Sequence, residues 1–172
     1  LDYNARGQRV LCQHANPTTG STSHSIEYRY DEKTFRLERL TTTRTSDSVV
    51  LQDLRYFFDA TGNITEIQDQ GAPPIFSGTT PVSGTGKYEY DALYRLTYAE
   101  GREHPGQQPS AAEPVRGSVP HANDLTALER YEEVYEYDEI GNIERVAHTS
   151  SSTNWTRRYD NATTSNRLNA TS

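Results

Sequence analysis

The sequence has no Met, one Cys and one Trp, and only 33% of its 172 residues are hydrophobic. The lone Cys12 excludes an internal disulfide and a zinc site built from cysteines, and such a residue usually packs as a small apolar side chain. No apolar run reaches the roughly 18 residues that a membrane-spanning helix needs. The first ten residues also lack the apolar stretch of a signal peptide. We therefore expect neither membrane insertion nor a thick hydrophobic core.

Positive charge is also scarce, because 17 Lys and Arg stand against 24 Asp and Glu, for a formal net charge of −7. Binding to nucleic acid needs a basic surface that neutralises phosphates. An anionic membrane surface attracts basic segments for the same reason. The charge therefore argues against both as partners.

The motifs of common catalytic and metal sites are missing as well. The five His show no metal-binding spacing, and we find no phosphate-binding glycine loop and no Ser-His-Asp set. We expect the histidines to lie on the surface or in loops, with His104, beside a proline-rich segment, as the best exception. The sequence predicts no enzyme, no catalytic residue, no cofactor and no metal.

The 12 Tyr, by contrast, are abundant and regularly placed. In the segment Lys87–Glu103, Tyr88 and Tyr90 are two residues apart and so share one face of a strand. Asp91 follows, and its side chain can accept a hydrogen bond from the backbone two residues on, which starts a turn. Arg95 then resumes an extended pattern. The segment is predicted to be a β-hairpin with Asp at its corner.

Variants of this hairpin recur six times, which predicts an array in which each hairpin needs a neighbour. The expected corners of the six units are Tyr3-Asn4, Tyr30-Asp31, Phe58-Asp59, Tyr90-Asp91, Tyr137-Asp138 and Tyr159-Asp160. The residues predicted to have a structural role in the motif are Tyr30, Asp31, Phe58, Asp59, Gly62, Tyr90, Asp91, Arg95, Tyr137, Asp138, Gly141, Tyr159 and Asp160.

Glycine follows the corner residue by three positions in three of the units, at Gly7, Gly62 and Gly141. This spacing is typical of a type I turn whose glycine takes the left-handed conformation. Thr34, Tyr94 and Thr163 stand at that position in the other three units, and we expect their loops to close differently. The last unit has a longer spacing after Asp160 and should have a looser turn.

Short segments rich in Tyr, Val, Ile and Thr flank the turns and predict strands. The expected strands are 25–30, 35–43, 49–58, 64–68, 131–137 and 143–147, with a bulge or turn near Gln52-Asp53. Long loops are expected at about 71–86, with Ile75-Phe76 as a possible anchor, and at 101–121. One short helix is expected near 124–130. The fold class is all-β, a curved strip of antiparallel sheet, in one domain, 1–172, or in a fragment of something larger.

Two features allow a functional alternative beside the structural one. The Asp corners could form a row of carboxylates for catalysis or Ca²⁺, but their repeated local position favours turn residues. The tyrosine ladder could bind carbohydrate, whereas the same rings also pair across strands to stabilise a sheet. We favour the structural interpretation of both and keep a carbohydrate or cell-surface binding module as the alternative.

The segments YFFDATGNI, YEYDALYRL and YEYDEIGNI resemble the RHS or YD-repeat family. Three longer stretches, in this order along the chain, are similar to the shell region of the B component of Tc (toxin complex) insecticidal toxins and to their SpvB-containing relatives. They are LQDLRYFFDATGNITEIQD, KYEYDALYRLTYAEGREH and HANDLTALERYEEVYEYDEIGNI. The resemblance covers nearly the whole chain.

The resemblance implies a wall segment of a hollow shell that holds a toxic polypeptide until delivery. Its implied partners are the rest of the shell, the enclosed polypeptide and other toxin-complex components, and its implied location is secreted or cell-surface. The family's shell also cleaves itself at an aspartyl-protease-like site with a DP-x-G-rich signature. Asp160-Asn161 does not fit this signature, so no catalytic residue is carried over to the chain.

Overall fold

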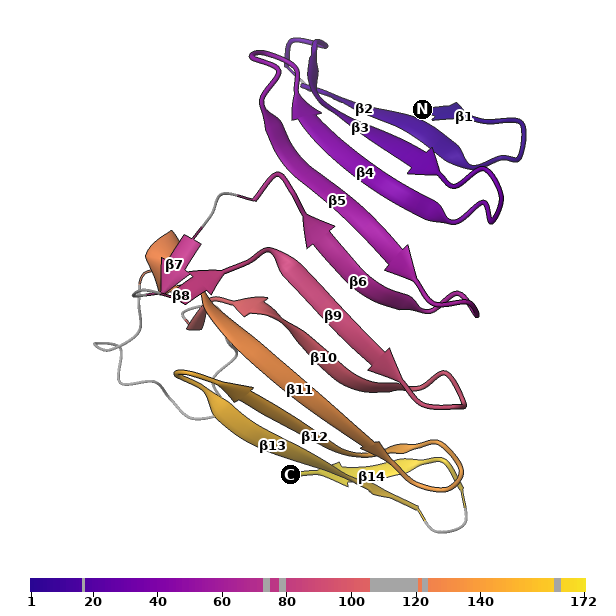
Figure 1. The fold of residues 1–172 in the computed structure, drawn as a ribbon, viewed down its shortest axis with the longest axis vertical. Coiled ribbons are helices and arrows are strands. Elements are labelled where there is room, and N and C mark those ends of the chain that lie inside the picture. The colour runs from indigo at the N-terminus through magenta and orange to yellow at the C-terminus, as the bar shows by residue number, and fades with distance from the viewer. Residues whose placement is uncertain (17, 73–74, 78–79, 106–120, 122–123, 163–164) are drawn as a thin grey trace. The chain divides into compact units, whose positions relative to one another are not determined.

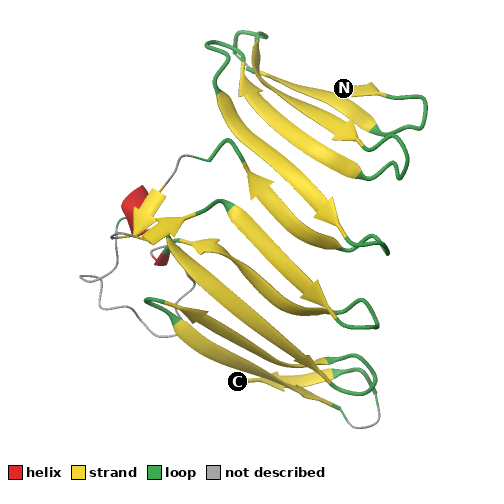
Figure 2. Ribbon diagram, viewed as in Figure 1, coloured by secondary structure: helices red, strands yellow, loops and turns green. Residues whose placement is uncertain are grey.

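The computed structural model describes residues 1–16, 18–72, 75–77, 80–105, 121, 124–162 and 165–172. The chain divides into two compact units, Leu1–Pro73 and Pro74–Ser172. Both are built from antiparallel strands (Figures 1 and 2). Among the described residues, no helix combines the length and the apolar character that crossing a membrane requires.

The first unit is a six-stranded sheet in which each strand pairs with the next one along the chain. Its strands are β1 (Asp2–Tyr3), β2 (Arg9–Ala15), β3 (Thr22–Tyr30), β4 (Leu37–Arg44), β5 (Val50–Phe58) and β6 (Ile64–Asp69). This order is that of a meander of hairpins, as the repeated Tyr-Asp corners predict.

The second unit has the same sequential strand order in its sheet, and its described residues also include a small hairpin and a helical turn. The sheet contains β9 (Thr85–Tyr90), β10 (Leu96–Glu103), β11 (Glu129–Tyr137), β12 (Ile143–Ser150), β13 (Asn154–Asn161) and β14 (Leu168–Thr171). The small hairpin pairs β7 (Ile75–Ser77) with β8 (Thr80–Val82), and η2 (Leu125–Ala127) is a 3₁₀ turn.

Alternate residues of the strands lie on opposite faces of each sheet, because the side-chain period of a strand is two. In β11 the odd-numbered positions from Glu129 to Tyr137 are buried or half-buried, and the even-numbered ones are exposed. The face that carries Tyr131, Tyr135 and Tyr137 is therefore aromatic, with Val134 on the other face as predicted. The opposite face is largely charged.

The hydrophobic interior is small. The buried apolar residues among those described are Cys12, Ile75, Val82, Ala99 and Val146. No large side chain in the described part of the chain is fully buried. Most apolar side chains are thus covered only by neighbouring side chains of the same sheet and not by a second layer, as the low hydrophobic content predicts.

The all-β prediction is confirmed, and some element boundaries are corrected. The expected loop at 71–86 holds the β7–β8 hairpin, in which Ile75 is buried but Phe76 is 55% exposed, and its last two residues begin β9. Residues 101–103, predicted to be loop, continue β10, because Gly101 and Glu103 pair with β11. Most of the remaining loop lies outside the described residues.

The helix expected near 124–130 is a single 3₁₀ turn. The carboxylate of Asp124 caps it by accepting hydrogen bonds from the backbone N–H of Thr126, 3.0 Å, and from the Thr126 hydroxyl, 2.6 Å. The helix stops at Ala127 because Glu129 and Arg130 already pair with β10 in the sheet.

Irregularities in strand register accompany the corners. The pairing shifts beside Tyr30, Phe58 and Tyr137, each the last residue of its strand before the corner. Away from the corners, Thr42 lies opposite Gln52 while Thr43 lies opposite Val50, which leaves Leu51 as the extra residue. The bulge predicted near Gln52-Asp53 therefore lies one residue earlier.

Candidate functional site

The corner of the β5–β6 hairpin shows what the recurring Asp does. The Oδ1 atom of Asp59 accepts hydrogen bonds from the backbone N–H groups of Thr61, Gly62 and Asn63 at 2.9, 2.7 and 2.9 Å, and from the Thr61 hydroxyl at 2.7 Å. Its Oδ2 accepts from the Asn63 side-chain amide at 2.8 Å. These bonds, led by that of the Thr61 hydroxyl, hold the pKa of Asp59 well below its usual range.

The other corners repeat the arrangement. Hydrogen bonds to the carboxylates of Asp31 and Asp91 lower their pKa values, chiefly the bond from the backbone N–H of Thr34 in the first and that of Arg95 in the second. Burial alone would raise the pKa of Asp138, but the side chain and backbone of Asn142 outweigh it and the pKa is lowered. Each carboxylate is thus engaged within its own turn.

The glycines take the predicted left-handed conformation, with φ of 77° at Gly7, 110° at Gly62 and 96° at Gly141. The prediction that the loop at Tyr94 closes differently is wrong. Tyr94 itself has φ of 63°, and its N–H donates to the Asp91 carbonyl at 3.0 Å, as the glycines do at their own corners. The loop after Asp31 is one residue longer, and Phe35 takes the left-handed place there, with φ of 60°.

Asp160 does not lie at a corner, contrary to the prediction. It is the seventh residue of β13 and pairs with Ala170. The backbone bond that closes the turn runs instead from the N–H of Ala162 to the carbonyl of Arg167, 2.8 Å. Two extra residues before Arg167 let the strand continue past Asp160, which moves the corner to Ala162.

Arginines at the exits of two turns fasten one hairpin to the next. Arg36 donates through Nη1 to the carbonyl oxygen of Asp59 at 2.9 Å, and its guanidinium lies 5.6 Å from the centre of the Phe58 ring. Arg95 donates through Nη1 to the carbonyl oxygen of Asp138 at 3.3 Å and lies 4.7 Å from the centre of the Tyr137 ring. We call each of these contacts an arginine latch.

Tyrosine hydroxyls make bonds in the opposite direction along the chain. The hydroxyl of Tyr30 donates to the carbonyl of Arg9 at 2.9 Å, and that of Tyr137 donates to the carbonyl of Leu96 at 2.8 Å. In both cases the acceptor begins the return strand of the preceding hairpin. The aromatic residue of the motif therefore joins adjacent hairpins.

A buried histidine lies at the centre of the aromatic face of the second unit. His148 on β12 is 3% exposed and contacts carboxylates through both ring nitrogens, Glu133 from Nδ1 at 3.1 Å and Glu103 from Nε2 at 3.0 Å. Its ring stacks against Trp155, 4.9 Å between centres, and Tyr131, 5.4 Å. We call these five residues, contributed by β10, β11, β12 and β13, the His148 cluster.

Further polar groups surround the His148 cluster. The hydroxyl of Tyr135 donates to the Glu133 carboxylate, and burial together with this bond raises the pKa of Tyr135. Glu129, 6% exposed, accepts hydrogen bonds from the hydroxyls of Ser150 and Ser152. The cluster's carboxylates and imidazole therefore bond within the sheet.

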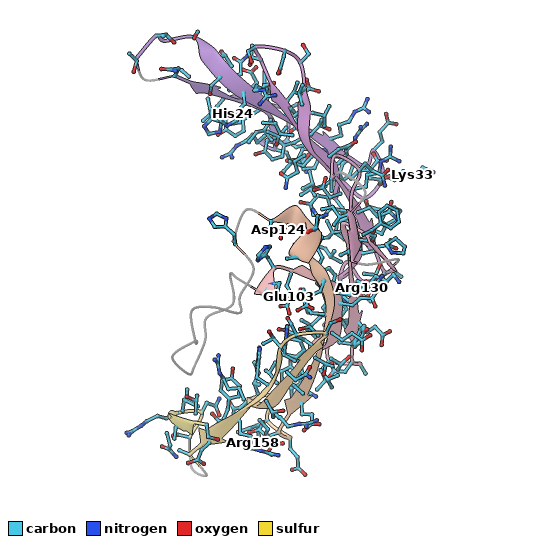
Figure 3. The ribbon with its side chains drawn as sticks, turned by 90° about the vertical axis from the view of Figure 1, so that its left-hand side faces the viewer. His24, Lys33, Glu103, Asp124, Arg130 and Arg158 are labelled. Atoms are coloured by element: carbon cyan, nitrogen blue, oxygen red, sulfur yellow. The ribbon has the colours of Figure 1, made fainter. Side chains whose placement is uncertain are left out.

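The opposite face of the second unit is an ionic network. The Glu100 carboxylate lies 3.0 Å from both Lys87 and Arg130, and it accepts from the Tyr98 hydroxyl at 3.1 Å. Burial and this hydrogen bond raise the pKa of Tyr98 to about 12. Arg130 pairs with Arg102, and the next pair along the two strands is Glu129 with Glu103. Arg130 therefore lies on the ionic face and Glu103 on the aromatic face, and Figure 3 labels both side chains.

The first unit has a counterpart on its own charged face. Arg39 holds Asp53 through two hydrogen bonds of 2.6 Å, and Asp53 is 8% exposed. The guanidinium keeps the pKa of this carboxyl below its usual range. A bidentate pair of this geometry fixes the relative position of β4 and β5.

The prediction of surface or loop histidines is wrong for His148, which is buried on β12, whereas His104, the named exception, lies in the loop directly after β10. His104 is 6% exposed, and its Nε2 lies 3.0 Å from the carbonyl oxygen of Asp124. The burial of His148 could have been predicted from its position two residues after Val146, because residues two apart in a strand lie on the same face, here the buried face of β12. Within the described ranges, no group of three His, Cys, Asp or Glu residues could hold a metal ion.

No known protein-family model matches the chain. Two toxin subunits of Yersinia entomophaga are similar in sequence over 90% of the chain, YenC2 with 32% and YenC1 with 33% identical residues. The chain spans only 16% and 15% of their lengths.

Two crystal structures of TcdB2-TccC3, one of them without its hypervariable C-terminal region, match 97% of the chain at 32% identity. Their TM-scores are 0.74 for the structure without that region and 0.69 for the other, and the chain corresponds to 8% of either.

The meander of Tyr-Asp hairpins defines the chain as a YD-repeat array. Together with the similarity to the YenC subunits and to TcdB2-TccC3, this array resembles the RHS-repeat shell region of Tc toxins.

Proposed function

We propose that this chain is a non-catalytic wall segment of an RHS-repeat shell that encloses a toxin or effector polypeptide and is secreted with it. The observation that carries the proposal is the way the hairpins are joined. Side chains beside the turn of one hairpin bond to the backbone of a neighbouring hairpin, Arg36 to Asp59 and Arg95 to Asp138 in the following hairpin, and Tyr137 to Leu96 in the preceding one.

A sheet fastened in this way has the properties of a wall. The sheet is stabilised mainly by contacts between neighbouring hairpins, because the buried apolar residues among those described are few and small. Its two faces differ in chemistry, so an aromatic surface and a charged one can meet different surroundings. The partners under this proposal are the neighbouring wall, the enclosed polypeptide and other components of the toxin complex.

Electron microscopy of the longer protein that contains this chain tests the proposal. We expect a hollow shell whose wall includes residues 1–172 and whose interior holds additional polypeptide. Limited proteolysis supplies a second readout, because an enclosed polypeptide should resist cleavage until the wall is unfolded. A solid body without an interior, or a cargo cut as fast in the native protein as in urea, would contradict the proposal.

The carbohydrate-binding alternative requires aromatic rings that are free to stack on a sugar. The hydroxyls of Tyr30 and Tyr137 are bound to neighbouring strands, and one face of Trp155 is stacked on His148. These contacts favour joints of the sheet over a binding platform. We expect a glycan array to show no binding above background, whereas binding abolished by Trp155→Ala would support the alternative.

A further inference from the structure

Three arginines form a row across the charged face of the first unit. The strand register places Arg29 of β3 opposite Arg39 of β4, and Arg39 opposite Arg55 of β5. Neighbouring strands lie about 4.8 Å apart, so the backbones of the outer two arginines are about 10 Å apart. Like charges that lie directly opposite one another destabilise a sheet. The row is therefore stabilised by any negative charge that binds to it.

Only the middle arginine has a carboxylate of its own. Asp53 accepts two hydrogen bonds of 2.6 Å from Arg39. Arg29 and Arg55 are exposed, and neither forms a hydrogen bond or an ion pair with any described residue. Arg55 only attracts Asp53 from a longer distance. Two guanidinium groups are thus available, and the fork of donors on each matches the geometry of a carboxylate.

The acidic residues nearby do not occupy these two guanidinium groups. Glu66, which lies opposite Phe57, accepts a hydrogen bond from the Gln68 side chain at 2.8 Å. Glu27 and Glu38 attract Arg39 without a hydrogen bond, and within the described ranges neither forms an ion pair. These acids reduce the local positive charge, but they leave the donors of the outer arginines unoccupied.

A groove lies along the row. One cavity of about 270 Å³ is lined by all three arginines together with Glu38 and Phe57. A second cavity of about 280 Å³ shares Glu38 and Phe57 and extends to the corner at Asp31. The side chain of Phe57 is 43% exposed. The groove therefore combines hydrogen-bond donors for anions with an apolar ring.

We propose that this groove binds an extended acidic segment of another polypeptide, with carboxylates on Arg29 and Arg55 and an apolar side chain on Phe57. Asp53 shows the binding mode, because it is a carboxylate already held by the row through two parallel hydrogen bonds. Carboxylates at alternate positions of an extended segment lie about 7 Å apart on one side, a spacing that flexible arginine side chains can match. The proposal rests on the wall function for the source of the polypeptide and adds the chemistry of that partner.

Fluorescence anisotropy with short labelled peptides tests the proposal. The first peptide alternates Glu with Ser and carries one Phe after the last Glu, and the matched peptide has Gln in place of every Glu. We expect the Glu peptide to bind, although the net charge of −7 repels acidic peptides in general. The Gln peptide should bind at least about tenfold more weakly. Added salt should weaken binding of the Glu peptide, because exposed ion pairs are screened.

Variants of the row locate the binding. Arg29→Gln and Arg55→Gln should each weaken binding of the Glu peptide about tenfold, and both should leave binding of the Gln peptide unchanged. Glu38→Gln should strengthen binding of the Glu peptide about threefold, because it removes a carboxylate that lines the groove. Arg39 is kept in every variant, since its loss would leave the buried Asp53 without its partner.

The matched control is Arg157→Gln on β13 of the second unit, which removes one exposed positive charge away from the groove. It should leave the affinity for the Glu peptide unchanged. No binding of the Glu peptide, equal binding of the two peptides, or equal effects of Arg55→Gln and Arg157→Gln would overturn the proposal. If an arginine variant does not fold, the comparison of the two peptides and the effect of Glu38→Gln still decide.

Two further measurements distinguish other occupants. Tripolyphosphate that displaces the labelled peptide at a lower concentration than unlabelled Glu peptide would overturn the choice of a polypeptide in favour of a phosphate compound. Self-association in sedimentation that Arg55→Gln abolishes would place a second copy of this chain in the groove and overturn the choice of another polypeptide. A hollow parent protein without peptide selectivity rejects only the groove, and a solid parent protein with intact selectivity rejects only the wall.

Discussion

Replacing Gly62 by Ala tests the arginine latch in a double-mutant cycle with Arg36→Ala. The new methyl group has two effects. It places a side chain at φ of 110°, and it lies 2.9 Å from the Arg36 guanidinium. The guanidinium must therefore shift, and we expect the shift to break its hydrogen bond to the carbonyl of Asp59. Arg36→Ala removes the second effect in advance and leaves the first.

The magnitudes follow from these contacts. A non-glycine residue in the left-handed region costs about 1–2 kcal/mol. The latch consists of hydrogen bonds from Arg36 to the carbonyls of Asp59 at 2.9 Å and Ala60 at 3.4 Å, with the Phe58 ring 5.6 Å away. For partly exposed groups these contacts stabilise the fold by about 1–2 kcal/mol. Gly62→Ala should therefore cost about 2–4 kcal/mol in the natural background but only about 1–2 kcal/mol in the Arg36→Ala background.

Urea unfolding followed by circular dichroism measures the four free energies, and hydrogen exchange of the amides near Asp59 reports the local change. The control is Gly7→Ala, because Gly7 has φ of 77° and nothing within 4 Å of the added methyl group. Its cost should not depend on Arg36. Equal costs of Gly62→Ala in both backgrounds would show that the guanidinium does not act as a latch.

Three other changes test other parts of the structure. Because the pKa of Asp59 is lowered on folding, the unfolded state binds more protons, so stability should fall as the pH drops below about 4, and Asp59→Asn should reduce that slope in urea unfolding between pH 5 and 3. His148→Ala should cost about 3 kcal/mol, since it leaves Glu103, whose side chain is 7% exposed, without this partner, and it should change Trp155 fluorescence. Tyr98→Phe should remove one ionisation near pH 12 from the ultraviolet titration and leave the curve below pH 11 unchanged.

The hairpins could be predicted from the sequence because their signals are local. A period of two in the strands, an Asp at the corner and a Gly three residues later are all read within about ten residues. The conformation of Gly141 follows from this pattern. That of Tyr94 does not, because the contacts of the turn impose a positive φ that its own side chain disfavours.

The functional contacts depend on register, which the sequence does not reveal. Glu133 faces His148 only because β11 and β12 pair in that register, and Glu103 reaches the same imidazole from 45 positions away in the chain. Arg95 meets the carbonyl of Asp138 across 43 positions and a long loop. The prediction of Asp160 as a corner was wrong for a simpler reason. Two extra residues before Arg167 displace the turn, and a Tyr-Asp pair alone does not determine where a turn begins.

The latches and tyrosine bonds join only hairpins that are neighbours in the chain, and this restricts how the protein can fold and fail. Growth of the sheet resembles polymerisation, in which each hairpin adds to the edge left by the one before. During synthesis the structure can extend from the N-terminus as each hairpin leaves the ribosome, without waiting for distant parts of the chain. A damaging substitution should accordingly melt its own hairpin and the two beside it, while hairpins farther away keep their hydrogen-exchange protection.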